Sequence, residues 1–187
     1  MDIDQITQIV GHISKDEGLW LSQVSADCQV LEIGCFRGKS TAYIASTANF
    51  VVCCDGFCGQ KILRTDQKPV DFTEVKRDFE KNLKALGLYD RIKLYPKISE
   101  LAFEEISVNH GKSFQVAFID GGHDEASVLA DLKYSDLILN GGIIAFHDYH
   151  DIRYPDVKKT VDRWSLNNSS RIKKFSSIGT IQAFHLH

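Results

Sequence analysis

The sequence lacks the features that would place it in a membrane or on a secretory route. No apolar run approaches the roughly 20 residues that a membrane-spanning helix needs. The first ten residues carry Asp2 and Asp4 and no basic residue, unlike the basic start of a secretory signal peptide. A basic excess is also missing, because the formal net charge is -3 at pH 7, which gives no general attraction to polyanions. We therefore expect a cytoplasmic protein without a membrane or nucleic-acid partner.

CxxC pairs are absent, although the sequence has five cysteines. We expect reduced thiols, since a free cysteine usually behaves as a small buried hydrophobe. A zinc site built from Cys53, Cys54 and Cys58 is the alternative. Adjacent residues of a strand point to opposite faces, so Cys53 and Cys54 would not easily converge on one ion.

Internal repeats, low-complexity tracts and linker-like stretches are also absent, which favours a single domain over residues 1–187. Within it we expect a helical segment over residues 1–25, a cofactor-binding core over 28–165 and a closing hairpin over 171–185. The hairpin is predicted from two β-type runs, 171–175 and 180–184, that flank a Ser/Gly turn.

Strand-like and helix-like runs alternate five times in the core. This alternation predicts an α/β fold with a doubly wound, Rossmann-like sheet, mostly parallel and covered by helices on both faces, with the terminal hairpin as an antiparallel edge. A helix capped by Asp124 is expected to continue through Leu137 and Ile138, and another to begin after a cap at Asp71. The remaining expected helices cover 39–48 and 155–164, and the strands cover 29–33, 49–54, 91–95, 114–119 and 143–146.

A glycine-containing loop follows the first expected strand, where open α/β sheets bind ligands. It reads E-x-G-x-x-x-G from Glu32 to Gly38, with Phe36 where a dinucleotide motif would have its middle glycine. A P-loop is missing as well. Glycines allow a tight turn and close approach of a ligand, and the following helix directs free N–H groups at it. Phe36 would hinder a pyrophosphate but not an amino-acid moiety.

An acid, Asp55, ends the second strand and lies at the usual spacing for accepting the ribose hydroxyls of a nucleoside-like cofactor. The alternative is that Glu32 and Asp55 are solvated acids and that the glycines only form turns. The spacing and order of all these residues together favour a cofactor site.

Three blocks, LEIGCFRGKST, VVCCDGF and VAFIDGGHDEASVLADLKYSDLILNGGIIAFHDY, resemble the class I methyltransferases. More narrowly, they are similar to the branch with macrolide sugar O-methyltransferases, cephalosporin hydroxylase-like proteins and, more distantly, catechol O-methyltransferase. The resemblance covers about residues 28–165 and implies S-adenosylmethionine as cofactor. It implies that the acid Asp55 holds the ribose, that Ser99 lies near the adenine, that Asp120 lies on the cofactor side, and that the methionine part contacts Glu32, Gly34, Cys35, Phe36, Gly38 and Ser40.

Acids and a histidine follow the fourth and fifth strands, namely Asp120, His147 and Asp148. Two converging carboxylates are costly unless a cation compensates them, and hard divalent ions prefer oxygen ligands. The resemblance implies Asp120 and Asp148 as metal ligands, and we expect His147 as a third ligand. His147 and Gly122 stand where the family pattern has acids, and an imidazole ligand favours Mn²⁺, Fe²⁺ or Zn²⁺ over Mg²⁺, so the identity of the metal stays open.

Methylation of a hydroxyl needs a base, because a protonated hydroxyl is a poor nucleophile. His123 is the favoured base, since imidazole titrates near neutral pH; His147 and His150 are alternatives. We therefore predict metal-assisted O-methylation of a small molecule, whose pocket the N-terminal segment and the loop 56–70 would shape. A nicotinamide-dependent oxidoreductase and a non-catalytic binding module are the alternative functions, and the assembly stays open between monomer and homodimer.

Overall fold

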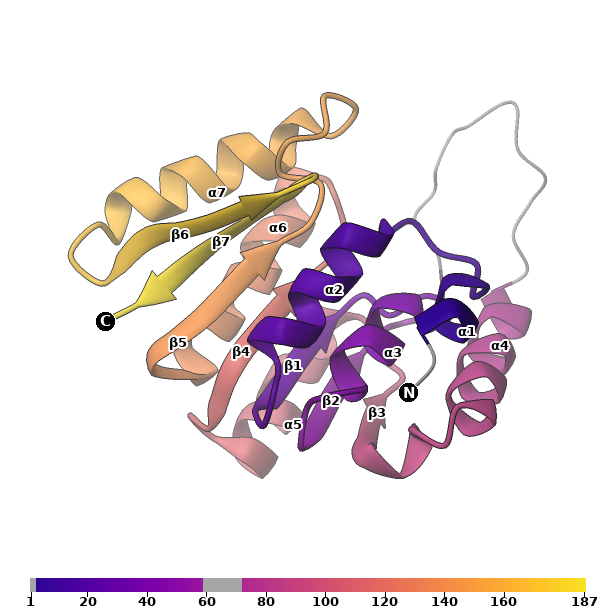
Figure 1. The fold of residues 1–187 in the computed structure, drawn as a ribbon. Coiled ribbons are helices and arrows are strands. Elements are labelled where there is room, and N and C mark those ends of the chain that lie inside the picture. The colour runs from indigo at the N-terminus through magenta and orange to yellow at the C-terminus, as the bar shows by residue number, and fades with distance from the viewer. Residues whose placement is uncertain (1–2, 59–71) are drawn as a thin grey trace.

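The computed structural model describes residues 3–58 and 72–187, and its centre is a seven-stranded sheet of order β3-β2-β1-β4-β5-β7-β6 (Figure 1). β1 to β5 run parallel, whereas β7 is antiparallel to both β5 and β6. The predicted doubly wound fold with an antiparallel hairpin at one edge is confirmed. The strands are β1 Gln29–Ile33, β2 Phe50–Cys54, β3 Ile92–Tyr95, β4 Phe114–Ile119, β5 Ile138–Phe146, β6 Ile172–Ile178 and β7 Ile181–Leu186.

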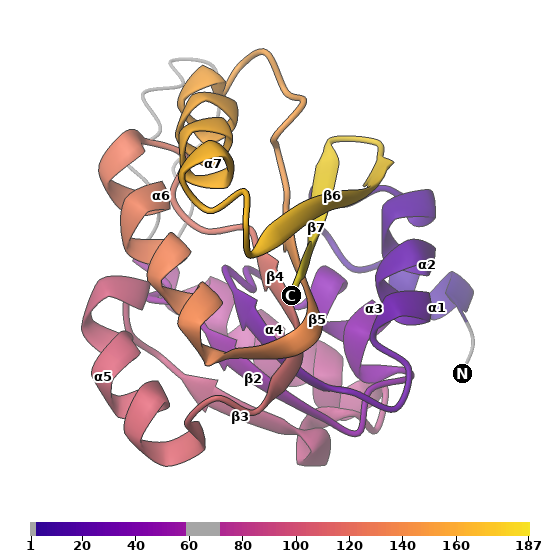
Figure 2. The same cartoon turned by 90° about the vertical axis from the view of Figure 1, so that its left-hand side faces the viewer.

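Helices cover both faces of this sheet and complete three layers. In Figure 2, α1, α2 and α3 lie on one side of the sheet and α5, α6 and α7 on the other. Residues of α4 pack into the same core as those of α1 to α3. The helices are α1 Ile3–Thr7, α2 Lys15–Val24, α3 Lys39–Ala45, α4 Phe72–Ala85, α5 Ser99–His110, α6 Glu125–Leu132 and α7 Pro155–Asn167, with 3-10 turns η1 Tyr89–Arg91 and η2 Lys133–Leu137.

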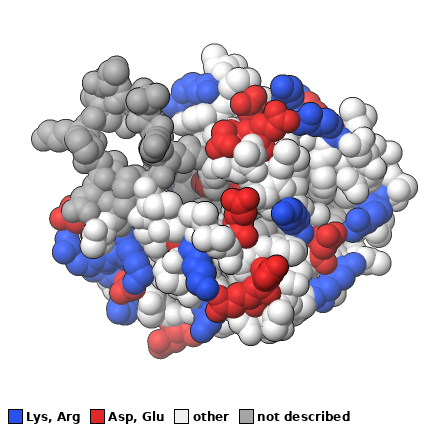
Figure 3. Space-filling model, turned by 180° about the vertical axis from the view of Figure 1, so that it is seen from behind, with Lys and Arg blue, Asp and Glu red and all other residues white. Residues whose placement is uncertain are grey.

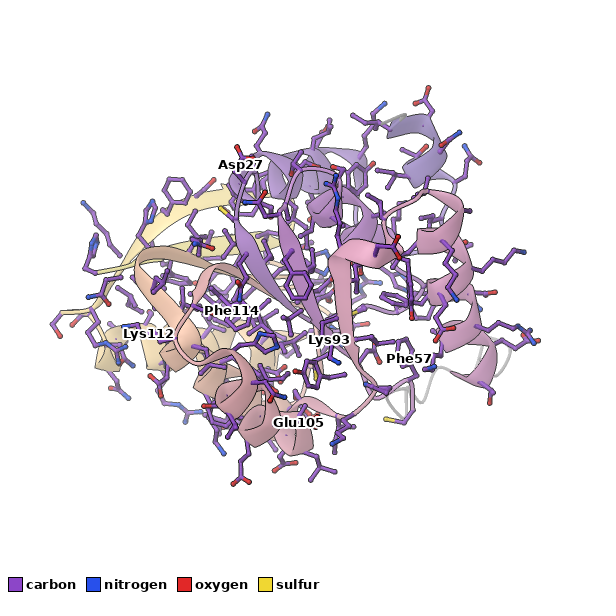
Figure 4. All side chains as sticks on the ribbon, turned by 90° about the horizontal axis from the view of Figure 1, so that it is seen from below. Asp27, Phe57, Lys93, Glu105, Lys112 and Phe114 are labelled. Carbon is purple, nitrogen blue, oxygen red and sulfur yellow. The ribbon has the colours of Figure 1, made fainter. Side chains whose placement is uncertain are left out.

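The central strands are apolar throughout because each of their faces contributes to a separate core. Val30 and Cys53 pack with α1 to α4, whereas their neighbours Leu31 and Cys54 pack with α5 to α7. This alternation follows from the two-residue period of a strand. It also confirms that Cys53 and Cys54 point away from each other. Phe114, at the start of β4, lies inside the molecule (Figure 4).

Two expectations about local structure were wrong. The helix α6 ends at Leu132, and the chain then tightens into η2, so that Leu137 lies in a 3-10 turn and Ile138 begins β5. A register shift between Phe114 and Val116 accompanies this longer strand. Helix α5 was missed because Leu101 and Val108 are 69% and 85% exposed, so its apolar residues do not form one stripe.

The expected cap at Asp71 and the loop over 59–70 lie outside the described residues. Among the residues that the structure describes, no helix is both long and apolar enough to cross a membrane. β1 pairs with β2 on one side and with β4 on the other, and the connections leave in opposite directions from this point. Such a reversal of strand order opens a crevice at the carboxyl ends of the strands. The residues that follow β1, β2, β4 and β5 are therefore the candidate site.

Candidate active site

The loop from Glu32 to Ser40 depends on Gly34. Gly34 has a φ of +83°, which side chains other than that of glycine rarely allow, and a Cβ there would lie 2.0 Å from the carbonyl oxygen of Asp120. The backbone of the loop after β1 therefore lies directly against the backbone after β4. Gly38, with a φ of +86°, turns the chain into α3. The path of the loop therefore requires glycine at Gly34 and favours it at Gly38.

Asp55 holds this loop from the end of β2. Its Oδ2 accepts hydrogen bonds from the backbone N–H groups of Cys35 and Phe36, both at 2.8 Å, and its Oδ1 accepts one from Phe57 at 2.6 Å. The ring of Phe57 packs 5.8 Å from that of Phe79 in α4, and Figure 4 shows Phe57 on the side of the molecule where α4 lies. A carboxylate offers about four acceptor positions, so these bonds use most but not all of them.

Glu32 is fully buried beneath the loop. Its Oε2 accepts from the Thr41 hydroxyl at 2.6 Å, and the Cys53 thiol lies 3.6 Å from the same oxygen. Burial raises the pKa of Glu32 to about 7. Its Oε1 has no hydrogen-bond partner among the described residues. Ser40, at the start of α3, is also buried, so Glu32 and Ser40 support the loop from below.

The buried atoms of Glu32, Cys35 and Cys53 lie within 4.8 Å of one another. Burial raises the pKa of the Cys53 thiol to about 11 and that of Cys35 well above its ordinary value. All three residues are buried, and both cysteines belong to the core that α1 to α4 form with the sheet. We therefore describe this group as packing beneath the loop.

A second group of side chains lies at the ends of β4 and β5. The N–H of Asp120 donates to Ile33 at 2.8 Å, and that of His147 donates to Ile119 at 2.9 Å, so strand pairing aligns the three strand ends. His147 is buried, with Nδ1 3.1 Å from Asp120 Oδ1 and 3.4 Å from Asp148 Oδ1. Although burial lowers the pKa of His147, the carboxylate of Asp120 and its other acidic neighbours raise it well above the ordinary value.

Asp148 connects this group to His123. Asp148 has a φ of +56°, and its Oδ2 lies 2.8 Å from His123 Nε2. The His123 ring stacks on Tyr154 with centroids 4.0 Å apart and an interplanar angle of 16°. Burial alone would raise the pKa of Asp148, but the contacts with His123 and His147 hold it well below its ordinary range. One ligand atom from each of Asp120, His123 and Asp148 lies within 4.8 Å of the others.

Two further predicted residues lie outside this group: His150, an alternative base, and Ser99, which was predicted beside the adenine. His150 is exposed, and its Nε2 lies 2.8 Å from the Ser177 hydroxyl. Ser99 begins α5, where its carbonyl accepts from the Tyr134 hydroxyl at 2.7 Å. Three contributors were missed by sequence reasoning, namely Glu17, Asp131 and Tyr154. Of these three residues, only Asp131 lies in one of the three blocks that resemble the methyltransferases. An acid among the apolar residues of the expected helix there was the one signal in the sequence.

A family model described as a methyltransferase domain matches residues 31–149, more than half of the chain. The chain belongs to this family. It is a class I S-adenosylmethionine-dependent methyltransferase, with the fold and the loop after β1 that the sequence predicted. The nicotinamide alternative is not supported. No curated protein matches the methyltransferase significantly.

Solved structures share the whole fold at low sequence identity. An O-methyltransferase from Bacillus cereus in complex with SAH has a TM-score of 0.70 at 17% identity, covering 98% of this chain and 90% of that one. The O-methyltransferase TomG from Streptomyces achromogenes, in complex with SAM, has a TM-score of 0.69 at 13% identity, covering 94% and 81%. An rRNA methylase from Streptococcus thermophilus has a TM-score of 0.62 at 17% identity, covering 94% and 99%. The fold alone therefore does not select an acceptor.

Proposed function

We propose that this methyltransferase transfers a methyl group from S-adenosylmethionine to a hydroxyl oxygen of a small molecule, with a divalent metal ion at the ends of β4 and β5. The observation that carries the proposal is the convergence of Asp120, His123 and Asp148 within 4.8 Å. Their strand ends adjoin the loop after β1, because the N–H of Asp120 donates to Ile33. Cofactor and reaction site would thus lie side by side.

The loop after β1 fits the amino-acid part of the cofactor. The N–H groups of Cys35 and Phe36 are taken by Asp55, so a carboxylate of the cofactor would be favoured by the N-terminal end of α3 rather than by these groups. Asp55 has an acceptor position left for a ribose hydroxyl after binding its backbone partners. The acids around the site would suit the positive sulfonium, from which the methyl group is transferred. We keep Ser99 as the residue beside the adenine, as the resemblance implies.

The acids after β4 and β5 fit a divalent metal. Asp120 and Asp148 offer carboxylate oxygens, and His123 offers an imidazole nitrogen, a donor set that suits Mn²⁺ at least as well as Mg²⁺. His147 fits less well as a ligand, because both of its nitrogens face carboxylates. We assign His147 to the support of Asp120 and Asp148. A bound divalent ion would lower the pKa of a hydroxyl in contact with it.

His123 is the proposed base. Methyl transfer forms an O–CH₃ bond as the S–CH₃ bond breaks, and the acceptor oxygen must lose its proton. A base must be held in place beside the acceptor oxygen, and His123 is held from two sides: Asp148 Oδ2 lies 2.8 Å from its Nε2, and Tyr154 stacks on its ring. The same imidazole is close enough to Asp120 and Asp148 to be a third metal ligand, and substitution separates the two roles.

A small acceptor is favoured over RNA, although rRNA methylases share the fold. On the face shown in Figure 3, the basic and acidic side chains of the described residues are interspersed and form no continuous basic patch. The formal net charge of -3 agrees with this. TomG, which acts in tomaymycin synthesis, and the TDP-rhamnose 3'-O-methyltransferase CalS11, an enzyme in calicheamicin biosynthesis, share the fold. A sugar or phenolic hydroxyl is therefore the acceptor class that we propose.

The test has a binding step and an activity step. S-adenosylhomocysteine and Mn²⁺ are titrated separately into the protein, and transfer from methyl-labelled S-adenosylmethionine is then measured with sugar and phenolic acceptors, with and without chelator. We expect both ligands to bind and chelation to reduce methyl transfer. Failure of S-adenosylhomocysteine to bind would contradict the cofactor site. Full activity in chelator would contradict only the metal.

A non-catalytic module makes a different prediction. It would bind S-adenosylhomocysteine but transfer no label to any acceptor, and Asp120→Ala and Asp148→Ala would leave Mn²⁺ binding unchanged. We expect instead that each substitution weakens Mn²⁺ binding. Asp156→Ala, which removes an acid from the first turn of α7, is the matched control.

A further inference from the structure

Glu17 is a buried acid of α2 that lies far from the candidate site in the sequence but beside it in the fold. It is 3% exposed, and its Oε2 accepts from the N–H of Ser14 at 2.8 Å and from the Ser14 hydroxyl at 2.7 Å. The Ser14 hydroxyl in turn accepts from the N–H of Glu17. These bonds form a capping box at the start of α2. The capping box therefore accounts for the hydrogen bonds of one carboxylate oxygen of Glu17, Oε2.

The other carboxylate oxygen of Glu17, Oε1, contacts a segment near the C-terminus. It accepts from the N–H of Thr180 at 2.7 Å and from the Thr180 hydroxyl at 3.0 Å, in the turn between β6 and β7. Figures 1 and 2 both show this turn beside the start of α2. A Cβ on Gly179 would lie 2.4 Å from this oxygen. The carbonyl of Thr180 also accepts from the N–H of His150, so the turn is joined to the segment after β5.

His147 completes the surroundings of Glu17. The Nε2 of His147 is buried, has no hydrogen-bond partner among the described residues, and lies 3.7 Å from Glu17 Oε1. The Nδ1 of the same ring faces Asp120 and Asp148. A buried carboxylate is costly unless a positive or donating group compensates it. Although burial raises the pKa of Glu17, His147 and Ser14 hold it well below its ordinary range.

We propose that Glu17 is a positioning residue of the active site, which fixes the ring of His147 and thereby the spacing of Asp120 and Asp148. A ring held only from its Nδ1 side could turn about its χ angles, and the two like-charged carboxylates would then separate. Glu17 prevents this from a helix that its own capping box anchors. The inference rests on the proposed metal site, because it assigns Glu17 to the support of two metal ligands.

The test compares Glu17→Gln and Glu17→Ala with Ser14→Ala and Thr180→Val, which remove other partners of Glu17 but keep its charge. Mn²⁺ affinity, S-adenosylhomocysteine affinity, thermal stability and the ring ¹⁵N resonances of His147 are measured for each. We expect Glu17→Ala to weaken Mn²⁺ binding by about tenfold or more, as for other residues that support a metal ligand, and to shift the His147 resonances. Glu17→Gln, which keeps the shape, is expected to do the same to a smaller extent.

The controls separate positioning from folding. Ser14→Ala and Thr180→Val are expected to lower the melting temperature but to change Mn²⁺ affinity and the His147 resonances less than Glu17→Gln does, because the Glu17 carboxylate is kept beside His147 Nε2. Wild-type Mn²⁺ affinity and His147 resonances in Glu17→Gln would overturn the proposal, as would equal losses in Thr180→Val. If the wild type binds no Mn²⁺, the metal proposal fails, while the His147 resonances still decide whether Glu17 fixes the ring.

Discussion

The two halves of the site are built in different ways. The loop after β1 is held by backbone groups: glycines set its path, and Asp55 accepts its N–H groups. The group after β4 and β5 is held by charged side chains, with His147 between Asp120 and Asp148 and with His123 against Asp148. The geometry of the loop therefore depends on the path of the backbone. The geometry of the group after β4 and β5 depends on the charges of its side chains and on the position of the histidine rings.

This difference determines what a substitution can do in each half. A change in the loop alters the backbone on which both halves rest, because Gly34 lies against the carbonyl of Asp120. A change in a side chain after β4 or β5 can remove chemistry while the loop keeps its shape. A substitution in the loop should therefore impair both cofactor binding and catalysis. A side-chain substitution after β4 or β5 should impair catalysis and leave cofactor binding intact.

His123→Ala should produce the largest effect, confined to catalysis. Loss of a positioned base lowers kcat by about 10² to 10⁴-fold. Binding of S-adenosylhomocysteine should stay as in the wild type, because His123 contacts Asp148 and Tyr154 rather than the loop. Single-turnover kinetics and calorimetry measure the two quantities. Unchanged Mn²⁺ affinity identifies a base, whereas a large loss of Mn²⁺ affinity identifies a third ligand.

Gly34→Ala should damage both halves together. The added Cβ would meet the Asp120 carbonyl at 2.0 Å in a backbone conformation that alanine rarely adopts, so we expect a loss of about 4 kcal/mol or more in the free energy of unfolding. Gly87→Ala is the matched control, since Gly87 has a φ of +67° with nothing within 4 Å; its cost should be only about 1 to 2 kcal/mol. If denaturant melts gave equal losses of unfolding free energy for Gly34→Ala and Gly87→Ala, the contact with the Asp120 carbonyl would not be the reason for glycine at position 34.

Asp55→Ala should weaken the loop but leave the metal half in place. Three backbone N–H groups lose a charged acceptor, which we expect to cost about 3 kcal/mol of stability. S-adenosylhomocysteine affinity should fall by about tenfold or more, since loop and ribose acceptor are lost together. Mn²⁺ affinity should not change. Calorimetry with S-adenosylhomocysteine and with Mn²⁺ measures both affinities. If only the Mn²⁺ affinity fell, Asp55 would support the metal site and not the cofactor loop.

The same contrast explains what the sequence could predict. Gly34, Gly38 and Asp55 could be predicted because a backbone-built loop needs particular residues at short, fixed spacings. Asp120 and Asp148 could be predicted because each follows a recognisable strand. Glu17 could not be found, because its approach to His147 depends on how α2 packs against the hairpin turn.

Helix α5 and the end of α6 show a further limit of the sequence. In α5, exposed apolar residues disturb the helical pattern that would have revealed it. After α6, the apolar residues Leu137 and Ile138 continue a helical spacing, yet they lie in a 3-10 turn and a strand. Pairing with β4 decides the conformation of Ile138, and such long-range pairing is not a local signal.

The smallest effect is expected at Asp131, a buried residue of α6 behind the loop after β4. A Cβ on Gly121 would lie 2.5 Å from its Oδ2, and neither of its carboxylate oxygens has a hydrogen-bond partner among the described residues. Burial raises the pKa of Asp131 to about 7. The folded protein therefore keeps this proton at a pH where the unfolded chain has lost it, so the free energy of unfolding falls as the pH rises from about 4 to 7.

Asp131→Asn removes that titration but buries an amide in a site without hydrogen-bond partners among the described residues, which we expect to cost about 1 to 3 kcal/mol near pH 3, where both states of the wild type are protonated. At about pH 8 the removed titration should more than offset this cost and leave a net gain of about 1 kcal/mol in the free energy of unfolding. Glu32, whose pKa is also raised to about 7 by burial, keeps its own contribution, so the slope should become smaller without vanishing. Urea melts across this pH range measure it. An unchanged slope in Asp131→Asn would show that the carboxyl group behind β4 contributes nothing to the pH dependence of stability.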